Sequence, residues 1–191
     1  MTATAIWASA ASAGANRAPD TAARTAATFV VPIAELPPAV ADMRDLILSA
    51  VRSGRLDDLA AAIEWNELPP DFGLAKDANP FVAWRALSRD GDGAEVLAWL
   101  GILLAGPPAS LPIGPDHENN AVYVWPHVSE LNPATLTPAQ KVGLFATVPG
   151  EVAAEFLKSG RWTWYRLAIG ADGTWHVFSR GAVTPASANT R

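Results

Sequence analysis

Residues 160–181 form the stretch that most constrains the fold, because two runs dense in aromatic residues flank a short turn sequence there. Within the turn, Gly173 can adopt the positive φ that closes a three-residue loop of the type I turn plus bulge kind. A β-hairpin is therefore predicted, with Gly170 opposite Thr174 and Ile169 opposite Trp175.

Continuing this register sorts the hairpin side chains onto two faces. The face predicted to enter the core collects Tyr165, Leu167, Ile169, Trp175 and Val177. The other face collects Trp162, Trp164, Arg166, His176, Phe178 and Arg180. This second face is both aromatic and charged, and it is too apolar to be left in water, so we expect something to cover it.

The rest of the chain predicts helices that pack on this hairpin. Apolar periodicity, proline starts and glycine stops indicate about six helices, near residues 40–51, 56–63, 80–87, 94–105, 137–147 and 151–158. Asp92 is the expected cap of the fourth helix, whose apolar residues, Ile102 included, are expected in the core. Residues 107–115 are interpreted as a proline-rich loop, and residues 121–125 as a strand that pairs with the hairpin. The predicted fold class is α+β: about six helices on a small antiparallel sheet made of strand 121–125 and hairpin 161–180.

Composition excludes several classes of function. The net charge is −5 and the 14 Lys and Arg residues form no run, which argues against a nucleic-acid surface. The absence of cysteine excludes thiol chemistry and disulfides. No apolar run is long enough for a membrane span, and no motif indicates a cofactor.

Residues 1–28 are mostly Ala, Thr and Ser, and residues 3–15 resemble the second half of a secretory signal peptide, although a basic start is missing. We interpret residues 1–28 as a signal-peptide remnant or a disordered tail, 29–182 as a single domain, and 183–191 as a disordered tail. The expected location is the periplasm or the outside of the cell.

Two functional hypotheses follow. The first is a non-enzymatic binding or interaction module of the cell envelope, in which a glycan, a peptide or an envelope protein contacts the mixed face of the hairpin. Its predicted ligand-binding residues are Trp162, Trp164, Arg166, His176 and Phe178. The alternative without a ligand is that helices from residues 137–158 pack on this face and cover it. A second chain could also pair with a free sheet edge and form a homodimer.

The alternative hypothesis is a metal-dependent hydrolase. His117, His127 and His176 could hold a zinc ion with one open position, and Asp116 or Glu118 could act as general base. No compact ligand spacing such as His-Glu-x-x-His supports it.

Several segments carry a family resemblance: residues 66–70 (NELPP), 123–126 (YVWP), 136–140 (LTPAQ) and 165–176 (YRLAIGADGTWH). Together they resemble a family of uncharacterised exported proteins of alphaproteobacteria, and the likeness spans residues 42–181. The resemblance implies export and a single domain. It implies no activity and assigns no catalytic residue.

Overall fold

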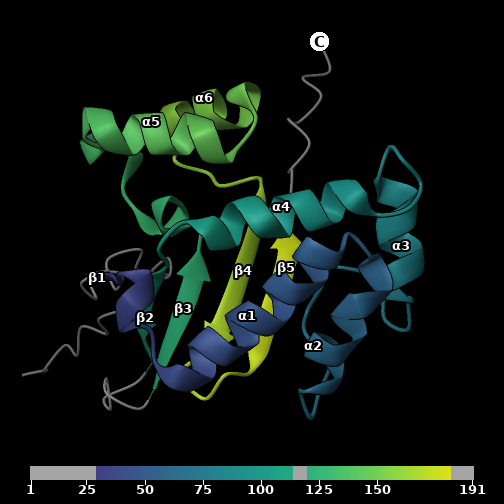
Figure 1. The fold of residues 1–191 in the computed structure, drawn as a ribbon. Coiled ribbons are helices and arrows are strands. Elements are labelled where there is room, and N and C mark those ends of the chain that lie inside the picture. Colours follow the sequence, from purple (N-terminus) through teal and green to yellow (C-terminus); the bar gives the residue numbers. More distant parts are fainter. Residues whose placement is uncertain (1–28, 114–119, 182–191) are drawn as a thin grey trace, which may run out of the picture.

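The computed structural model describes residues 29–113 and 120–181 (Figure 1). Its helices are α1 (Pro38–Ser53), α2 (Ala60–Glu64), α3 (Pro80–Leu87), α4 (Ala94–Ala105), α5 (Pro138–Thr147) and α6 (Gly150–Ser159). Its strands are β1 (Phe29–Val30), β2 (Ala109–Pro112), β3 (Ala121–Trp125), β4 (Tyr165–Gly170) and β5 (Trp175–Arg180). The predicted leader at 1–28, the tail at 183–191 and His117 with its acidic neighbours lie outside the described residues.

The strands form one antiparallel sheet in the order β1-β2-β3-β4-β5. The α+β class, the six helices and the C-terminal hairpin are therefore confirmed, and β3 pairs with β4 as expected. The prediction of a loop at residues 107–115 is wrong in part, because Ala109–Pro112 forms β2. The prediction failed because prolines at the ends of a segment do not exclude a strand. Pro108 precedes the strand and Pro112 ends it, so neither interrupts the strand's interior.

The hairpin register holds at the turn and then shifts. Ile169 lies opposite Trp175 as predicted, but a β-bulge between Ala168 and Ile169 leaves His176 as an extra residue. Beyond the bulge Leu167 lies opposite Phe178 instead of Val177. One inserted residue exchanges the two faces of a strand, so Phe178 is fully buried in the core and Val177 is only partly buried.

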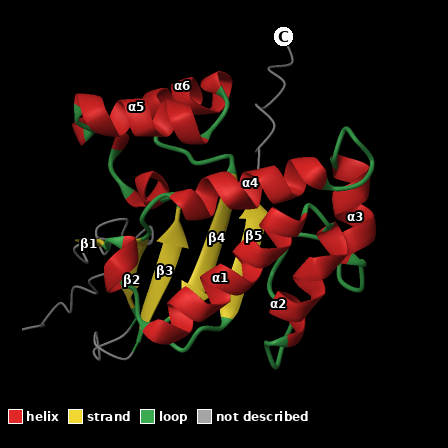
Figure 2. Ribbon diagram, in the orientation of Figure 1, coloured by secondary structure: helices red, strands yellow, loops and turns green. Residues whose placement is uncertain are grey.

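Helices α1 and α4 cover one face of the sheet (Figure 2). Val96, Leu97, Leu100, Leu103 and Leu104 of α4 are buried there as predicted. Ile102 is the exception, because it lies on the side of α4 that faces away from the sheet and is 47% exposed.

Helix caps are only partly as expected. Thr137 and Gln140 form the capping box predicted for α5, and the Asn79 side chain caps α3. The predicted Asp92 cap of α4 is wrong. Instead the Asp90 carboxylate accepts the N–H groups of Gly93 and Ala94, because Gly93 turns the chain with a φ of 94°.

Helices α5 and α6 form a separate small lobe. They lie beyond α4, away from the sheet, as Figure 1 shows. The lobe has its own hydrophobic cluster, made of Val128, Leu136, Leu144, Val148, Ala153 and Phe156. The molecule therefore has a main core between the sheet and α1–α4, and a second core under α5 and α6.

The two sheet edges differ. On β5, Trp175 N–H donates to the Asn66 side chain at 2.8 Å, and Asp71 exchanges backbone hydrogen bonds with His176 and Phe178 at 2.8 and 2.9 Å. On the opposite edge, β1 has two residues and Phe29 is 64% exposed. The homodimer stays a prediction, and β1 is the edge it would use.

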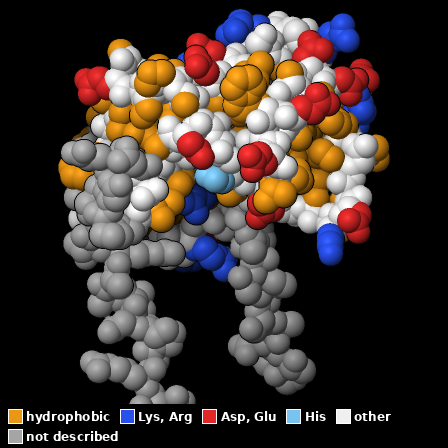
Figure 3. Space-filling view, turned by 90° about the horizontal axis from the view of Figure 1, so that it is seen from below, with side chains coloured by type: hydrophobic (Ala, Val, Ile, Leu, Met, Phe, Trp, Pro, Cys, Tyr) orange, Lys and Arg blue, Asp and Glu red, His pale blue; other side chains and the backbone are white. Residues whose placement is uncertain are grey.

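The surface near the β4–β5 turn is mixed. Figure 3, which views the molecule from below, shows hydrophobic patches interspersed with acidic and basic side chains and a histidine near the centre. Among the described helices none is long and apolar enough to cross a membrane.

Candidate functional site

The five hairpin residues predicted to bind a ligand do not lie together. Trp162 packs edge-to-face on Phe156 of α6, with ring centroids 5.2 Å apart, and its indole N–H donates to the Tyr165 carbonyl at 3.3 Å. For Trp162 the structure therefore shows helix packing and not an open ligand site, because α6 covers the indole.

Three further residues of the set are also separated from one another. Arg166 forms an ion pair with Glu130 through one of its terminal nitrogens. His176 is exposed on β5, whereas Phe178 is buried between Trp84 and Tyr165 in the core. A buried ring cannot line a surface groove, and the bulge that moves Phe178 inward explains why the sequence pattern misplaced it.

Trp164 is the member of the set that lines an open hollow. It is partly buried and packs against both hydrophobic clusters. Its ring meets Trp99 of α4 edge-to-face at 5.7 Å, and the Arg180 guanidinium lies over it at 4.8 Å. Trp164 and Arg180 therefore share a site, but not through the predicted register, because the bulge places Arg180, instead of Ser179, opposite Tyr165.

The hollow beside Trp164 has a volume of about 440 Å³, and four charged side chains line it. Its polar lining includes Arg89, Glu95, Glu151 and Arg180, together with Tyr165. Burial raises the pKa of the Tyr165 hydroxyl; the Arg180 charge opposes that rise and the Glu95 charge adds to it.

This hollow is one of three that adjoin one another along α4. A second, of about 220 Å³, shares Trp99, Pro149 and Trp164 with it. A third, of about 590 Å³, shares Ile102, Ala146 and Thr147 with the second. The three hollows form a row between α4 and the α5–α6 lobe, with neighbouring hollows sharing lining residues, and we call this row the α4–α5 groove.

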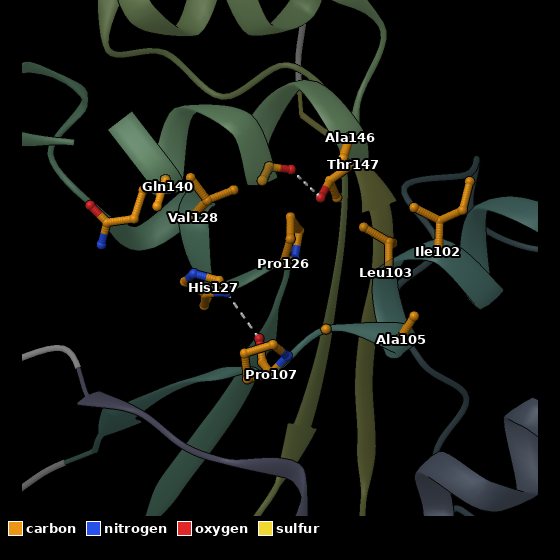
Figure 4. Close-up of a pocket in the computed structure, with 13 residues that line it drawn as sticks. Ile102, Leu103, Ala105, Pro107, Pro126, His127, Val128, Gln140, Ala146 and Thr147 are labelled. Carbon is orange, nitrogen blue, oxygen red and sulfur yellow. Dashed lines mark hydrogen bonds between the residues drawn. The ribbon is translucent and has the colours of Figure 1, made fainter. Parts of the chain in front are cut away.

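The largest hollow of the groove is mainly apolar (Figure 4). Ile102 and Leu103 of α4 lie on one side of it, with Val128, His127 and Gln140 across from them. Its lining residues are Ile102, Leu103, Ala105, Gly106, Pro107, Pro126, His127, Val128, Ala139, Gln140, Gly143, Ala146 and Thr147. None of them is Lys, Arg, Asp or Glu.

His127 is held at the edge of this hollow. Its Nδ1 lies 3.1 Å from the Pro107 carbonyl, which can only accept, so Nδ1 carries the proton and Nε2 is left as the acceptor in the neutral ring. Burial lowers the pKa of His127, and the hydrogen bond to Pro107 partly opposes this. The neutral imidazole is therefore the favoured form near pH 7.

The α5 wall of the groove is built from small residues. Ala139, Gly143 and Ala146 line the largest hollow at helical spacing, opposite the exposed Ile102. The sequence analysis missed this wall. The signal available in the sequence was the helical spacing of the small residues Ala139, Gly143 and Ala146.

The proposed zinc site is not assembled by the described residues. His127 follows β3 beyond Trp125, whose register partner is Leu167, whereas His176 lies beside Gly170 at the other end of β4. One ion with bonds of about 2 Å cannot bind both side chains. Within residues 29–113 and 120–181, no three His, Cys, Asp or Glu side chains are grouped to hold a metal.

Comparison of the chain with protein-family models, with curated proteins and with solved structures finds no match in any of the three. The resemblance to exported alphaproteobacterial proteins therefore stays a prediction.

Proposed function

We propose that this protein is a binding module of the cell envelope that takes an apolar peptide segment of a partner protein in the α4–α5 groove. The observation that carries the proposal is the row of three hollows, which share lining residues from Trp164 at one end to Ile102 and beyond. Concave, mainly apolar surfaces with a few polar groups are the usual form of a binding site.

The lining favours a peptide over the other ligands considered. A glycan needs many hydrogen-bonding partners, whereas the two hollows around Ile102 have no charged lining residue and are mainly aliphatic. Two helices form the walls, and the small residues of α5 leave space opposite Ile102. Apolar side chains of a peptide, presented in a groove between helices, fit that surface.

The envelope location is supported by a different observation, the alanine-rich segment at residues 3–15 with its small-residue cleavage options. It is independent of the groove. The binding proposal can therefore stand if the protein is located elsewhere.

A display selection tests the proposal. The full chain is immobilised and used to select from random dodecapeptides, and the enriched peptides are synthesised and titrated. We expect apolar sequences, whose affinity falls at least tenfold with Ile102→Asp. The matched control is Val142→Asp, because Val142 is an aliphatic residue of α5 that is 71% exposed and does not line the groove.

Two results would contradict the proposal. One is a selection that enriches no apolar peptide. The other is equal binding by wild type and Ile102→Asp, which would place the peptides outside the groove.

A further inference from the structure

We infer that the segment bound in the α4–α5 groove carries a carboxylate next to its apolar side chains, and that Arg180 binds this carboxylate. The inference rests on the proposed function and adds the chemistry and orientation of the ligand. It follows from how charge is distributed along the groove, which is neutral around Ile102 and charged beside Trp164.

Two of the four charged side chains at the Trp164 end, Arg89 and Glu95, already face each other. The Glu95 carboxylate accepts the Arg89 backbone N–H at 3.1 Å and lies 3.7 Å from the Arg89 guanidinium. Glu151 lies in the first turn of α6, where the helix dipole favours a negative charge. Arg89 and Glu95 thus offset each other, and Glu151 is stabilised by its own helix.

Arg180 is in a different position. It is exposed, and among the ion pairs formed by described residues none involves it. Its Nε donates to the Thr163 carbonyl at 3.3 Å, and its guanidinium lies over the Trp164 ring at 4.8 Å. These two contacts hold the planar group in place while other N–H donors remain for a carboxylate.

The position of Arg180 sets the direction of the ligand. A segment with its carboxylate on Arg180 would place its apolar side chains over Trp99 and Ile102, toward the largest hollow. Aliphatic lining at one end and a guanidinium without an ion-pair partner among the described residues at the other complement a peptide of this chemistry.

The test uses the peptides selected against the full wild-type chain, each synthesised with its Asp and Glu residues and again with Asn and Gln in their place. Binding is titrated through Trp fluorescence, since Trp99 and Trp164 line the groove. We expect the wild type to prefer the acidic version by about fivefold, in the range of an accessible ion pair. In Arg180→Gln this preference should disappear, while Arg180→Lys, which keeps the charge, should retain part of it.

Arg89→Gln is the matched control, because Arg89 lines the same hollow but already faces Glu95. The preference should survive in that variant. Equal binding of both peptide versions by the wild type would overturn the inference while leaving the proposed function intact. So would a preference that persists in Arg180→Gln. Failure to select any apolar peptide would instead overturn the proposed function itself.

Discussion

The indole of Trp164, which precedes β4, meets the indole of Trp99 on α4 at a centroid distance of 5.7 Å and an interplanar angle of 71°. Trp164 also packs against the cluster under α5 and α6, so it contacts both cores of the molecule. This contact joins the α5–α6 lobe to the main body beside the groove.

Trp164→Ala should therefore destabilise the protein without abolishing its fold. Because the ring is only partly buried, we expect a loss of about 2 kcal/mol in the free energy of unfolding, below the range for a fully buried Trp. Urea denaturation measures the loss. Trp65→Ala is the control, since Trp65 is 71% exposed and should change stability by less than about 0.5 kcal/mol. Equal effects of the two substitutions would refute this role of Trp164.

The ion pair between Arg166 and Glu130 supports the turn after β3. The Glu130 side chain is 16% exposed and also accepts the Ser129 hydroxyl at 3.0 Å, whereas the Arg166 Nε is buried without a hydrogen-bond partner among the described residues. Glu130→Gln keeps the size of the side chain but removes the charge that compensates Arg166. We expect a loss of about 1 kcal/mol, measured by thermal and urea denaturation.

The pair of Arg44 with the exposed Asp45 provides the comparison for Glu130. Asp45 is 68% exposed, so Asp45→Asn should change stability by less than about 0.5 kcal/mol. If Glu130→Gln is as mild as Asp45→Asn, the Arg166 pair contributes no more than a surface contact.

Much of the fold was predictable because local signals and packing agree. Proline starts and glycine stops located α1, α5 and α6, and the capping box of Thr137 and Gln140 is present as expected. The hairpin turn was equally clear, since Gly170 N–H donates to the Thr174 carbonyl and Gly173 has a φ of 86°. In these places the local structure is determined by residues only a few positions apart along the chain.

The remaining errors arise where distant segments decide the outcome. Next to the bulge at His176, Asp71 pairs with β5 from outside the hairpin, and no local sequence pattern indicates this contact. The groove is likewise formed by α4 and α5, which lie far apart in the sequence. In the sequence, Ile102 resembles a core residue of an apolar helix. Its burial depends on where the α5–α6 lobe lies, and in the structure it is 47% exposed.

Gly173 offers a direct test of how closely the β4–β5 turn packs against α1. Gly173 and Gly54 both have a positive φ, but a Cβ on Gly173 would lie 2.8 Å from the Ala39 carbonyl oxygen of α1, whereas one on Gly54 would have nothing within 4 Å. Gly54→Ala should therefore cost about 1 kcal/mol for the backbone conformation alone. Gly173→Ala should cost about 2–3 kcal/mol, because the clash with backbone adds to that strain. Equal losses by urea denaturation would show that α1 does not hold the turn.

The lowered pKa of His127 predicts how the stability of the protein depends on pH. Its pKa is lowered in the folded state, first by burial, so below the ordinary value of 6.5 the unfolded chain binds a proton that the folded protein resists. Stability should be full above that value and should fall as pH drops through 6.5 toward the lowered pKa. Asp90 and Asp172 also have lowered pKa values, through hydrogen bonds from the Ser88 hydroxyl and the Thr174 N–H respectively, but their contributions change only near and below 3.8.

Urea denaturation at pH 7 and pH 5.5 isolates the histidine, since the aspartates stay ionised over this interval. The free energy of unfolding should fall between the two pH values in the wild type and fall less in His127→Gln, which does not titrate but can still donate to the Pro107 carbonyl. His176→Gln is the matched control, because His176 is exposed on β5, and it should follow the wild type. Because His127 lines the groove, protonation would also place a charge in its apolar part, so peptide affinity should decrease over the same pH interval. A wild type and a His127→Gln variant with the same pH dependence would show that the burial of this imidazole has no influence on stability.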